Sequence, residues 1–141
     1  MLTYAKVFNL DKEKNANKVY RALDQGSGKE YLNAFMSEAQ KPGVMDLCRA
    51  QLMITENYVC YYGRFRQEIY IIPLADLVNV YTSNCFYGNY NYTCKAIALE
   101  TRNNETFYVS QCMQKQNVAD YNTAQEYLIK RCASNESSLI A

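Results

Sequence analysis

The stretch QLMITENYVCYYGRFRQEIYIIPLADLVNVYT, residues 51–82, decides the fold. It contains short runs of β-branched and aromatic residues, and turn residues interrupt these runs about every ten positions. The same pattern continues as far as residue 111. Runs of this length and composition are typical of strands that are joined by hairpins. The sequence therefore predicts an antiparallel sheet over residues 44–116.

Turn residues set the limits of the individual strands. We expect Glu56-Asn57 to form a tight turn, and Pro73 to mark a strand end because proline cannot donate to a β-ladder. Asn103-Asn104 suits a turn that requires positive φ. The expected strands are residues 50–55, 58–62, 68–72, 77–82, 92–101 and 106–111.

Alternation and aromatic content single out two parts of this sheet. With a period of two, Leu77, Asn79 and Tyr81 share one face of their strand. An aromatic hairpin tip is expected around Gly88-Asn89. Such a tip is either a contact surface or a set of cross-strand pairs that stabilises a face without a partner. The candidate interaction surface consists of Phe86, Tyr87, Tyr90 and Tyr92.

Helical periodicity dominates residues 1–43. Asp11 suits the N-cap of a first helix. Ser27 and Glu30 have the spacing of a capping box, which would begin a second helix that ends before Pro42-Gly43. The sequence therefore predicts a helical hairpin whose amphipathic helices need another element to pack against.

A C-terminal helix is expected over residues 117–133, followed by a tail over residues 134–141. Asn117 can cap this helix, and Lys130 and Arg131 lie near its C-terminal end, where the helix dipole favours positive charge. The side chains expected on its inward face are Val118, Tyr121, Ala124, Leu128 and Cys132.

Length and composition indicate the architecture. A chain of 141 residues fits one domain, and 49% hydrophobic with 21% charged residues is ordinary for a globular protein. Neither a linker nor an internal repeat divides the sequence. We therefore expect a single α+β domain, with an N-terminal helical hairpin, an antiparallel sheet of six to seven strands and a C-terminal capping helix.

The segment IIPLADLVNVY, residues 71–81, resembles a signature of small bacterial pleckstrin-homology-like (PH-like) proteins, which are related to GRAM domains. In that signature an isoleucine-proline pair is followed by an aspartate with a hydrophobic residue, and then by a tyrosine. The resemblance covers about residues 50–132 and leaves out the N-terminal helices. It implies a PH-like curved sheet or partly open barrel that a terminal helix caps. Many such proteins have no assigned activity, so the resemblance implies a fold more than a function.

The residue types behind common catalytic chemistry are scarce. The chain has no histidine, which removes the commonest general base and every Ser-His or Cys-His dyad. Its carboxylates are scattered, and its five glycines form no phosphate-binding loop. We therefore expect no enzymatic activity, no cofactor and no metal site. A carboxylate pair assembled from distant positions stays open.

Charge indicates no nucleic-acid partner, because the net charge is only +1 and the signs are interspersed. Arg64 and Arg66 form an R-x-R pair at an expected inter-strand turn, so the PH-like resemblance makes them candidates for contact with an anionic headgroup. Two solvated arginines are the alternative. A locally basic N-terminal group is interpreted as a solvated helix face, namely Lys6, Lys12, Lys14, Lys18 and Arg21.

Cysteine usage and hydropathy favour a cytoplasmic protein. The six cysteines include no C-x-x-C pair, and most lie in apolar runs, as buried thiols in a reducing compartment do. The apolar segment after Met1 is too short for a secretion signal, and no stretch is long and apolar enough to span a bilayer.

Two functions are compatible with these patterns. The first is a non-catalytic PH-like interaction module that binds a protein partner or itself, through the aromatic hairpin or a sheet edge. The alternative is a small-molecule or lipid-binding domain, with a pocket between the sheet and the N-terminal helices. Neither function involves nucleic acid, and peripheral contact with lipid is a further alternative.

Overall fold

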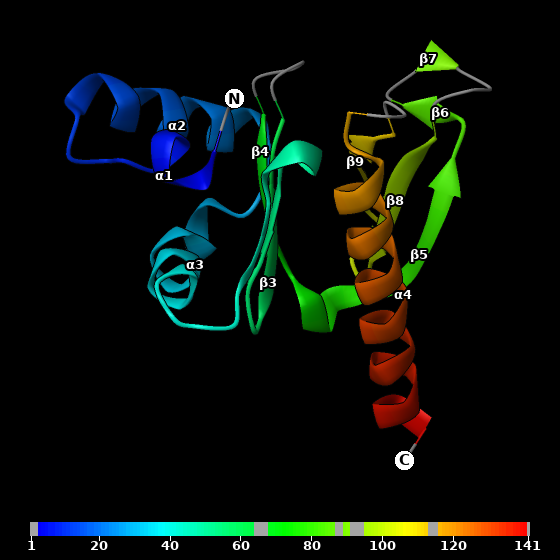
Figure 1. Cartoon of the computed structure of the whole chain (residues 1–141). Coiled ribbons are helices and arrows are strands. Elements are labelled where there is room, and N and C mark those ends of the chain that lie inside the picture. Colours follow the sequence, from blue (N-terminus) through cyan, green and yellow to red (C-terminus); the bar gives the residue numbers. More distant parts are fainter. Residues whose placement is uncertain (1–2, 64–67, 87–88, 91–94, 113–115, 141) are drawn as a thin grey trace. The chain divides into compact units, whose positions relative to one another are not determined.

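The computed structural model describes residues 3–63, 68–86, 89–90, 95–112 and 116–140, with the backbone alone for residues 86, 89–90 and 136–140. The chain forms two compact units, residues 1–73 and 74–141, and each unit has helices and an antiparallel sheet of its own (Figure 1). The predicted α+β class is confirmed. The prediction of one sheet with six to seven strands is wrong, because the described strands form separate sheets of four and three strands and a two-stranded ladder.

The first unit places three α-helices before its sheet. The helices are α1 (Tyr4–Val7), α2 (Glu13–Gln25) and α3 (Leu32–Ala39), and the 3-10 turn η1 (Lys29–Tyr31) precedes α3. The sheet has the order β1-β2-β3-β4, with β1 (Met45–Leu47), β2 (Leu52–Ile54), β3 (Tyr58–Tyr62) and β4 (Ile69–Pro73). A second 3-10 turn, η2 (Cys48–Ala50), separates β1 from β2.

The strand bounds in this unit agree with the sequence in part. The bounds of β3 are those predicted, and Pro73 ends β4 as expected. Strand β1 was not predicted, because three residues are too few to show alternation. Helix α2 follows Lys12 and has no side-chain cap, so the prediction that Asp11 caps it is wrong.

The three helices lie on one side of the four-stranded sheet and share a core with it (Figure 1). Phe8 is central to this core, with ring centroids 4.9 Å from Tyr4, 5.5 Å from Phe35 and 6.4 Å from Tyr62. Full burial of one such side chain stabilises the fold by about 1.5–3 kcal/mol. These four aromatic residues therefore fix α1 and α3 against β3.

The segment Gly26-Ser27-Gly28 leaves α2 and pairs with β4. The amide of Ser27 donates to the carbonyl of Ile69 (3.1 Å), and the amide of Ile71 donates to the carbonyl of Ser27 (2.8 Å). The predicted capping box is therefore wrong: η1 follows Gly28 and has no side-chain cap. The local capping signal is overridden because backbone pairing with a distant strand places Ser27 at the sheet.

Glu38 connects α3 to the turn between β2 and β3 by hydrogen bonds. Its carboxylate accepts hydrogen bonds from Thr55 Oγ1 (2.7 Å) and from the backbone and side-chain nitrogens of Asn57 (2.9 and 2.6 Å). Burial disfavours the charged carboxylate, but these hydrogen bonds outweigh burial and lower the pKa of Glu38. The amide of Thr55 also donates to the carbonyl of Tyr58 (2.9 Å), which closes the predicted turn.

The second unit begins with the 3-10 turn η3 (Leu74–Asp76) and contains a three-stranded sheet of order β5-β8-β9. Its elements are β5 (Leu77–Ser83), β6 (Cys85–Phe86), β7 (Asn89–Tyr90), β8 (Ala96–Thr101), β9 (Thr106–Gln111) and α4 (Val118–Ile140). The bounds of β9 are those predicted. Asn104 has a φ of 62°, so the turn with positive φ is confirmed.

A β-bulge changes which side chains share a face of β5. Leu77 pairs with Thr101, whereas Asn79 pairs with Glu100. Because Thr101 and Glu100 are neighbours on β8, they face opposite sides of the sheet. The prediction that Leu77 and Asn79 share a face is therefore wrong, since the extra residue of the bulge reverses the alternation.

Helix α4 packs against β5 and η3 (Figure 1). It begins directly after Asn117, whose carbonyl accepts from the amide of Tyr121 (2.9 Å), so the predicted start is confirmed. Val118 is 41% exposed, so its predicted inward position is wrong. The other four predicted inward side chains are buried, namely Tyr121, Ala124, Leu128 and Cys132.

The C-terminal half of α4 is longer than the sequence predicts, because it continues to Ile140 where a tail was expected. Asn135 lies in this part and is 8% exposed. Its Nδ2 donates to the carbonyls of Leu74 (2.7 Å) and Leu77 (3.1 Å). These bonds tie the helix to the start of β5 and explain why the helix does not end near residue 133.

Candidate ligand-binding site

The first unit contains a pocket of about 430 Å³, lined by residues of α1, of α2 and of the adjoining ends of β3 and β4. Its volume lies in the range of roughly 300–1,000 Å³ that small-molecule sites occupy. The lining residues that the structure describes all belong to residues 1–73. The described lining therefore comes from the first unit.

Helix α2 provides one wall of the pocket. Asn15, Lys18, Ala22 and Gln25 are spaced 3, 4 and 3 residues apart, which places them along one face of the helix, and Arg21 lies next to this face. This row borders the apolar stripe with which α2 packs on the sheet. The sequence of α2 therefore positions polar side chains at the rim and apolar ones beneath them.

Asn15 joins α1 to α2. Its Nδ2 lies 3.0 Å from the carbonyl oxygen of Lys6, 2.9 Å from that of Val7 and 3.0 Å from that of Asn9. These carbonyls lie at the C-terminal end of α1, where carbonyls lack partners within the helix. The contact places the backbone of Lys6 and Val7, both of which line the pocket, beside α2.

The buried part of the lining consists of Val19, Ala22, Tyr62 and Ile69. The hydroxyl of Tyr62 is 3.5 Å from Asp46 Oδ1. Burial and the negative charge of Asp46 raise the pKa of Tyr62 well above its ordinary range. The phenol therefore stays protonated and donates towards Asp46.

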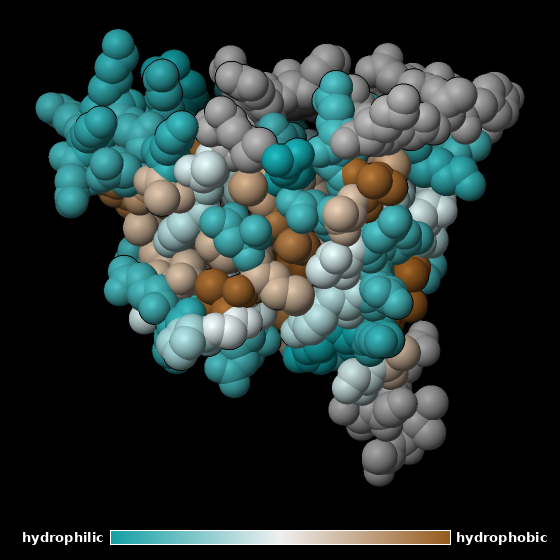
Figure 2. All heavy atoms as spheres, viewed as in Figure 1, coloured by the Kyte–Doolittle hydropathy of each residue, from teal (hydrophilic) through white to brown (hydrophobic). Residues whose placement is uncertain are grey.

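The described lining is strongly basic, because Lys6, Lys18 and Arg21 belong to it and none of the lining residues that the structure describes is acidic. Within the part of the chain that the structure describes, neither Lys18 nor Arg21 forms an ion pair. Asp24, which precedes Gln25, instead pairs with Lys29 (Nζ–Oδ1 2.9 Å). The visible surface over α2 is correspondingly hydrophilic (Figure 2).

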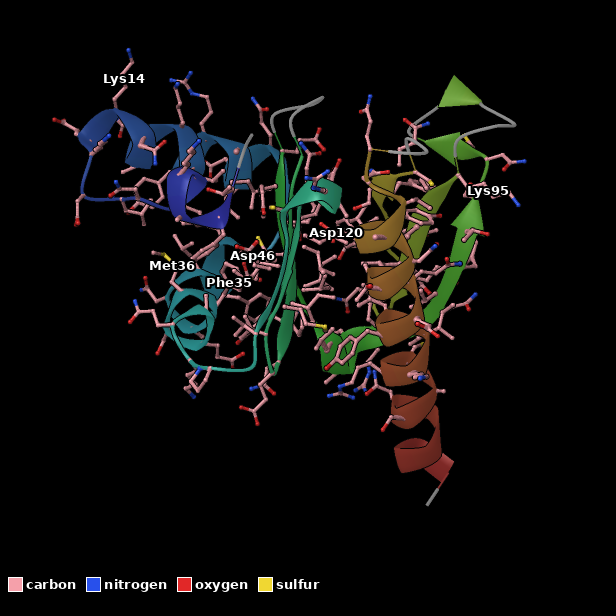
Figure 3. The ribbon with its side chains drawn as sticks, viewed as in Figure 1. Lys14, Phe35, Met36, Asp46, Lys95 and Asp120 are labelled. Carbon is pink, nitrogen blue, oxygen red and sulfur yellow. The ribbon has the colours of Figure 1, made fainter. Side chains whose placement is uncertain are left out.

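The basic group is exposed, as the solvated-face interpretation expects, and three of its five members, Lys6, Lys18 and Arg21, also line the pocket. The other two, Lys12 and Lys14, are exposed and do not line it. Lys14 projects outward from α2 (Figure 3). A signal was present in the sequence, because Lys18 shares its helix face with Asn15 and Gln25, but only the fold brings Lys6 to the same place.

The predicted site residues fall mostly outside the described residues. Arg64, Arg66, Tyr87 and Tyr92 all lie there. Phe86 and Tyr90 are on β6 and β7, whose backbones pair Phe86 with Asn89 and Cys85 with Tyr90. The hairpin ladder is thus confirmed, and both the interaction surface and the headgroup contact stay predictions.

Among residues 3–63, 68–86, 89–90, 95–112 and 116–140, no group of three or more Cys, Asp or Glu side chains is placed to hold a metal ion. Over the described ranges, no helix has the length and apolar character needed to cross a membrane. Cys60 is buried as expected, and burial raises the pKa of its thiol well above the ordinary value.

Comparison with known proteins identifies no family for the chain. No protein-family model, no curated protein and no solved structure matches it. Function is therefore inferred from the geometry and charge of the site.

Proposed function

We propose that this protein is a non-catalytic small-molecule-binding domain whose ligand occupies the pocket between the N-terminal helices and the sheet. The pocket itself carries the proposal. It combines a volume of about 430 Å³ with an apolar base and a few convergent polar side chains. Concave sites of this composition are the usual binding sites for small molecules.

The walls of the pocket are held by contacts that do not depend on a ligand. Asn15 connects the two helices, and Tyr62, which lines the pocket, packs on Phe8 with centroids 6.4 Å apart. A wall that is already ordered loses little conformational entropy when a ligand binds. This preorganisation supports binding as the role of the first unit.

The PH-like resemblance is part of the proposal, and the path of the chain supports it. Residues 71–81 join β4 to β5 through η3, and a hairpin and a long terminal helix follow, as the resemblance implies. The proposed compartment is the cytoplasm, which the cysteine usage favours.

Native mass spectrometry of the full chain, purified gently from its own host, tests the proposal. We expect an adduct of small-molecule mass on the unaltered chain. The Ala22→Leu variant should lose it, because the larger side chain occupies the pocket that Ala22 lines. Ala34→Leu, at an exposed position on α3, is the matched control and should keep the adduct. A clean unaltered chain, or an adduct that survives in Ala22→Leu, would contradict the proposal.

An interaction module is the second candidate function, and an aromatic pair on the three-stranded sheet favours it. Tyr81 and Tyr108 both pair with Ala98, from opposite sides, so their side chains share a face of the sheet. Tyrosine is enriched at protein interfaces. We expect that replacing Tyr87 and Tyr90 with serine lowers the mass measured by light scattering if the aromatic hairpin mediates self-association. An unchanged oligomer would exclude the hairpin as the contact.

A further inference from the structure

We infer that the ligand of this pocket is an organic phosphate, whose phosphate group binds Lys6, Lys18 and Arg21 and whose organic part packs on the apolar base. The inference rests on the proposed binding function and specifies the class of its ligand. Three observations carry it: the sign of the charge around the pocket, the donor chemistry of its rim and the size of its apolar base.

The charge around the pocket is unbalanced. Lys18 and Arg21 are three residues apart on α2, and like charges at this spacing destabilise a helix. The fold then adds Lys6 from α1 to the same pocket. A ligand with two negative charges relieves this repulsion, whereas a single carboxylate offsets one cation only.

The acidic residues close to the pocket have other partners. Asp24 pairs with Lys29, and Asp46 accepts from the hydroxyl of Tyr62 (3.5 Å). Arg21 offers a planar fork of donors that matches two phosphate oxygens, and Lys18 offers a point charge. The rim therefore supplies the donors that phosphate groups bind in proteins.

The base of the pocket is too large and too apolar for a phosphate ion alone. Val19, Ala22 and Ile69 line it, and its volume is about 430 Å³. An inorganic ion would leave most of this volume filled with water, whereas an organic part can occupy the space above the apolar base. A soluble phosphate ester and the headgroup of a phospholipid present the same chemistry, and the experiment below distinguishes them.

The test is a titration of the ¹⁵N-labelled full chain, followed by the amide shifts of Ala22, Gly63 and Ile69. Phenyl phosphate is the probe, and benzoate and phenol have the same ring with one charge and none. We expect phenyl phosphate to shift these amides and to bind at least about tenfold more tightly than either analogue. Raising the salt concentration should weaken its binding, because the cations are exposed.

Two double variants locate the phosphate. Lys18→Gln with Arg21→Gln should weaken phenyl phosphate binding at least about tenfold. Lys12→Gln with Lys14→Gln removes the same charge from exposed positions that do not line the pocket, and should leave the affinity within about twofold. All four residues are exposed, so folding should be unaffected, and the salt dependence of the unaltered chain is a check that needs no variant.

Each outcome has a defined meaning. If phenol binds as tightly as phenyl phosphate and the pocket variant has no effect, the phosphate inference is overturned but the proposed binding function stands. If no probe shifts these amides at millimolar concentration, the inference is also overturned, and the adduct from the host decides the binding function separately. Equal losses in the two double variants would show a general charge effect and overturn the inference as well.

Sedimentation with lipid vesicles distinguishes a lipid headgroup from a soluble phosphate ester as the ligand. Phosphatidylcholine vesicles that contain phosphatidic acid at about one lipid in five are sedimented with the chain, beside vesicles without it. Sedimentation that the pocket variant abolishes and the control variant does not would support a lipid headgroup as the ligand. Binding of phenyl phosphate without sedimentation would support a soluble phosphate ester.

Discussion

Replacing Gly28 with alanine should strongly destabilise the first unit. The backbone at this position has a left-handed conformation that residues with a side chain rarely adopt, and it lies close to β4. Gly28 has a φ of +92°, and a Cβ would lie 2.8 Å from the carbonyl carbon of Ile71 and 2.9 Å from its Cβ. Carbon atoms do not approach so closely without a shift of the chain. The shift would break the hydrogen bonds between Ser27 and β4.

The magnitude follows from the two separate costs. The left-handed conformation costs alanine about 1 kcal/mol. The two hydrogen bonds that join Ser27 to Ile69 and Ile71 contribute about 1 kcal/mol each. Gly28→Ala should therefore lower the free energy of unfolding by about 3 kcal/mol.

Substitutions at two other glycines measure the cost of the left-handed conformation and the cost of the close approach separately. Gly43 has a φ of +88° but no atom within 4 Å of a Cβ, so Gly43→Ala should cost only about 1 kcal/mol. Gly26 has an ordinary φ of −99°, but its Cβ would lie 2.8 Å from the carbonyl carbon of Ile69, so Gly26→Ala should cost about 2 kcal/mol. Because Gly26 and Gly28 act on the same hydrogen bonds, their effects should not add.

Urea denaturation followed by circular dichroism measures the three losses, and hydrogen exchange of the Ile71 amide reports on the contact itself. We expect this amide, which donates to Ser27, to exchange faster in Gly26→Ala and Gly28→Ala than in Gly43→Ala. Equal losses for Gly28→Ala and Gly43→Ala would refute the reasoning, because they would show that the approach to β4 has no cost.

Three further predictions concern single side chains. Because the folded state lowers the pKa of Glu38, its contribution to stability should be complete above the ordinary carboxyl range and be lost as the pH falls through the lowered pKa. Urea midpoints between about pH 7 and pH 3 should show this loss, and a Glu38→Gln variant with the same pH dependence would contradict it. Asn135→Ala should cost about 2 kcal/mol, because two backbone carbonyls lose a buried donor, and Asn135→Asp, which has no donor, should cost at least as much. Burial raises the pKa of Tyr121 to about 12, and among the described residues its buried hydroxyl has no hydrogen-bond partner, so Tyr121→Phe should leave the midpoint unchanged or raise it. A loss above about 1 kcal/mol in Tyr121→Phe would show that the hydroxyl has a partner.

The sequence by itself determined the features that depend on a few adjacent residues. The bounds of β3 and β9, the strand end at Pro73 and the positive φ of Asn104 follow from composition and turn chemistry within short windows. The buried face of α4 follows from helical spacing, apart from Val118 at its first position. Such signals are legible because the physical causes, namely side-chain period and backbone strain, act locally.

Only the tertiary structure decided how these elements pair and what lies between them. Ser27 satisfies a local capping pattern, yet its backbone pairs with β4, and Asn135 extends α4 by bonding to the carbonyls of Leu74 and Leu77. The pocket has the same origin. The spacing on α2 places Lys18 and Gln25 on the same face of the helix. Lys6 lines the same pocket only because Asn15 holds α1 against α2. Contacts between residues far apart in sequence depend on packing and hydrogen bonding in three dimensions, which the pattern of a single segment does not contain.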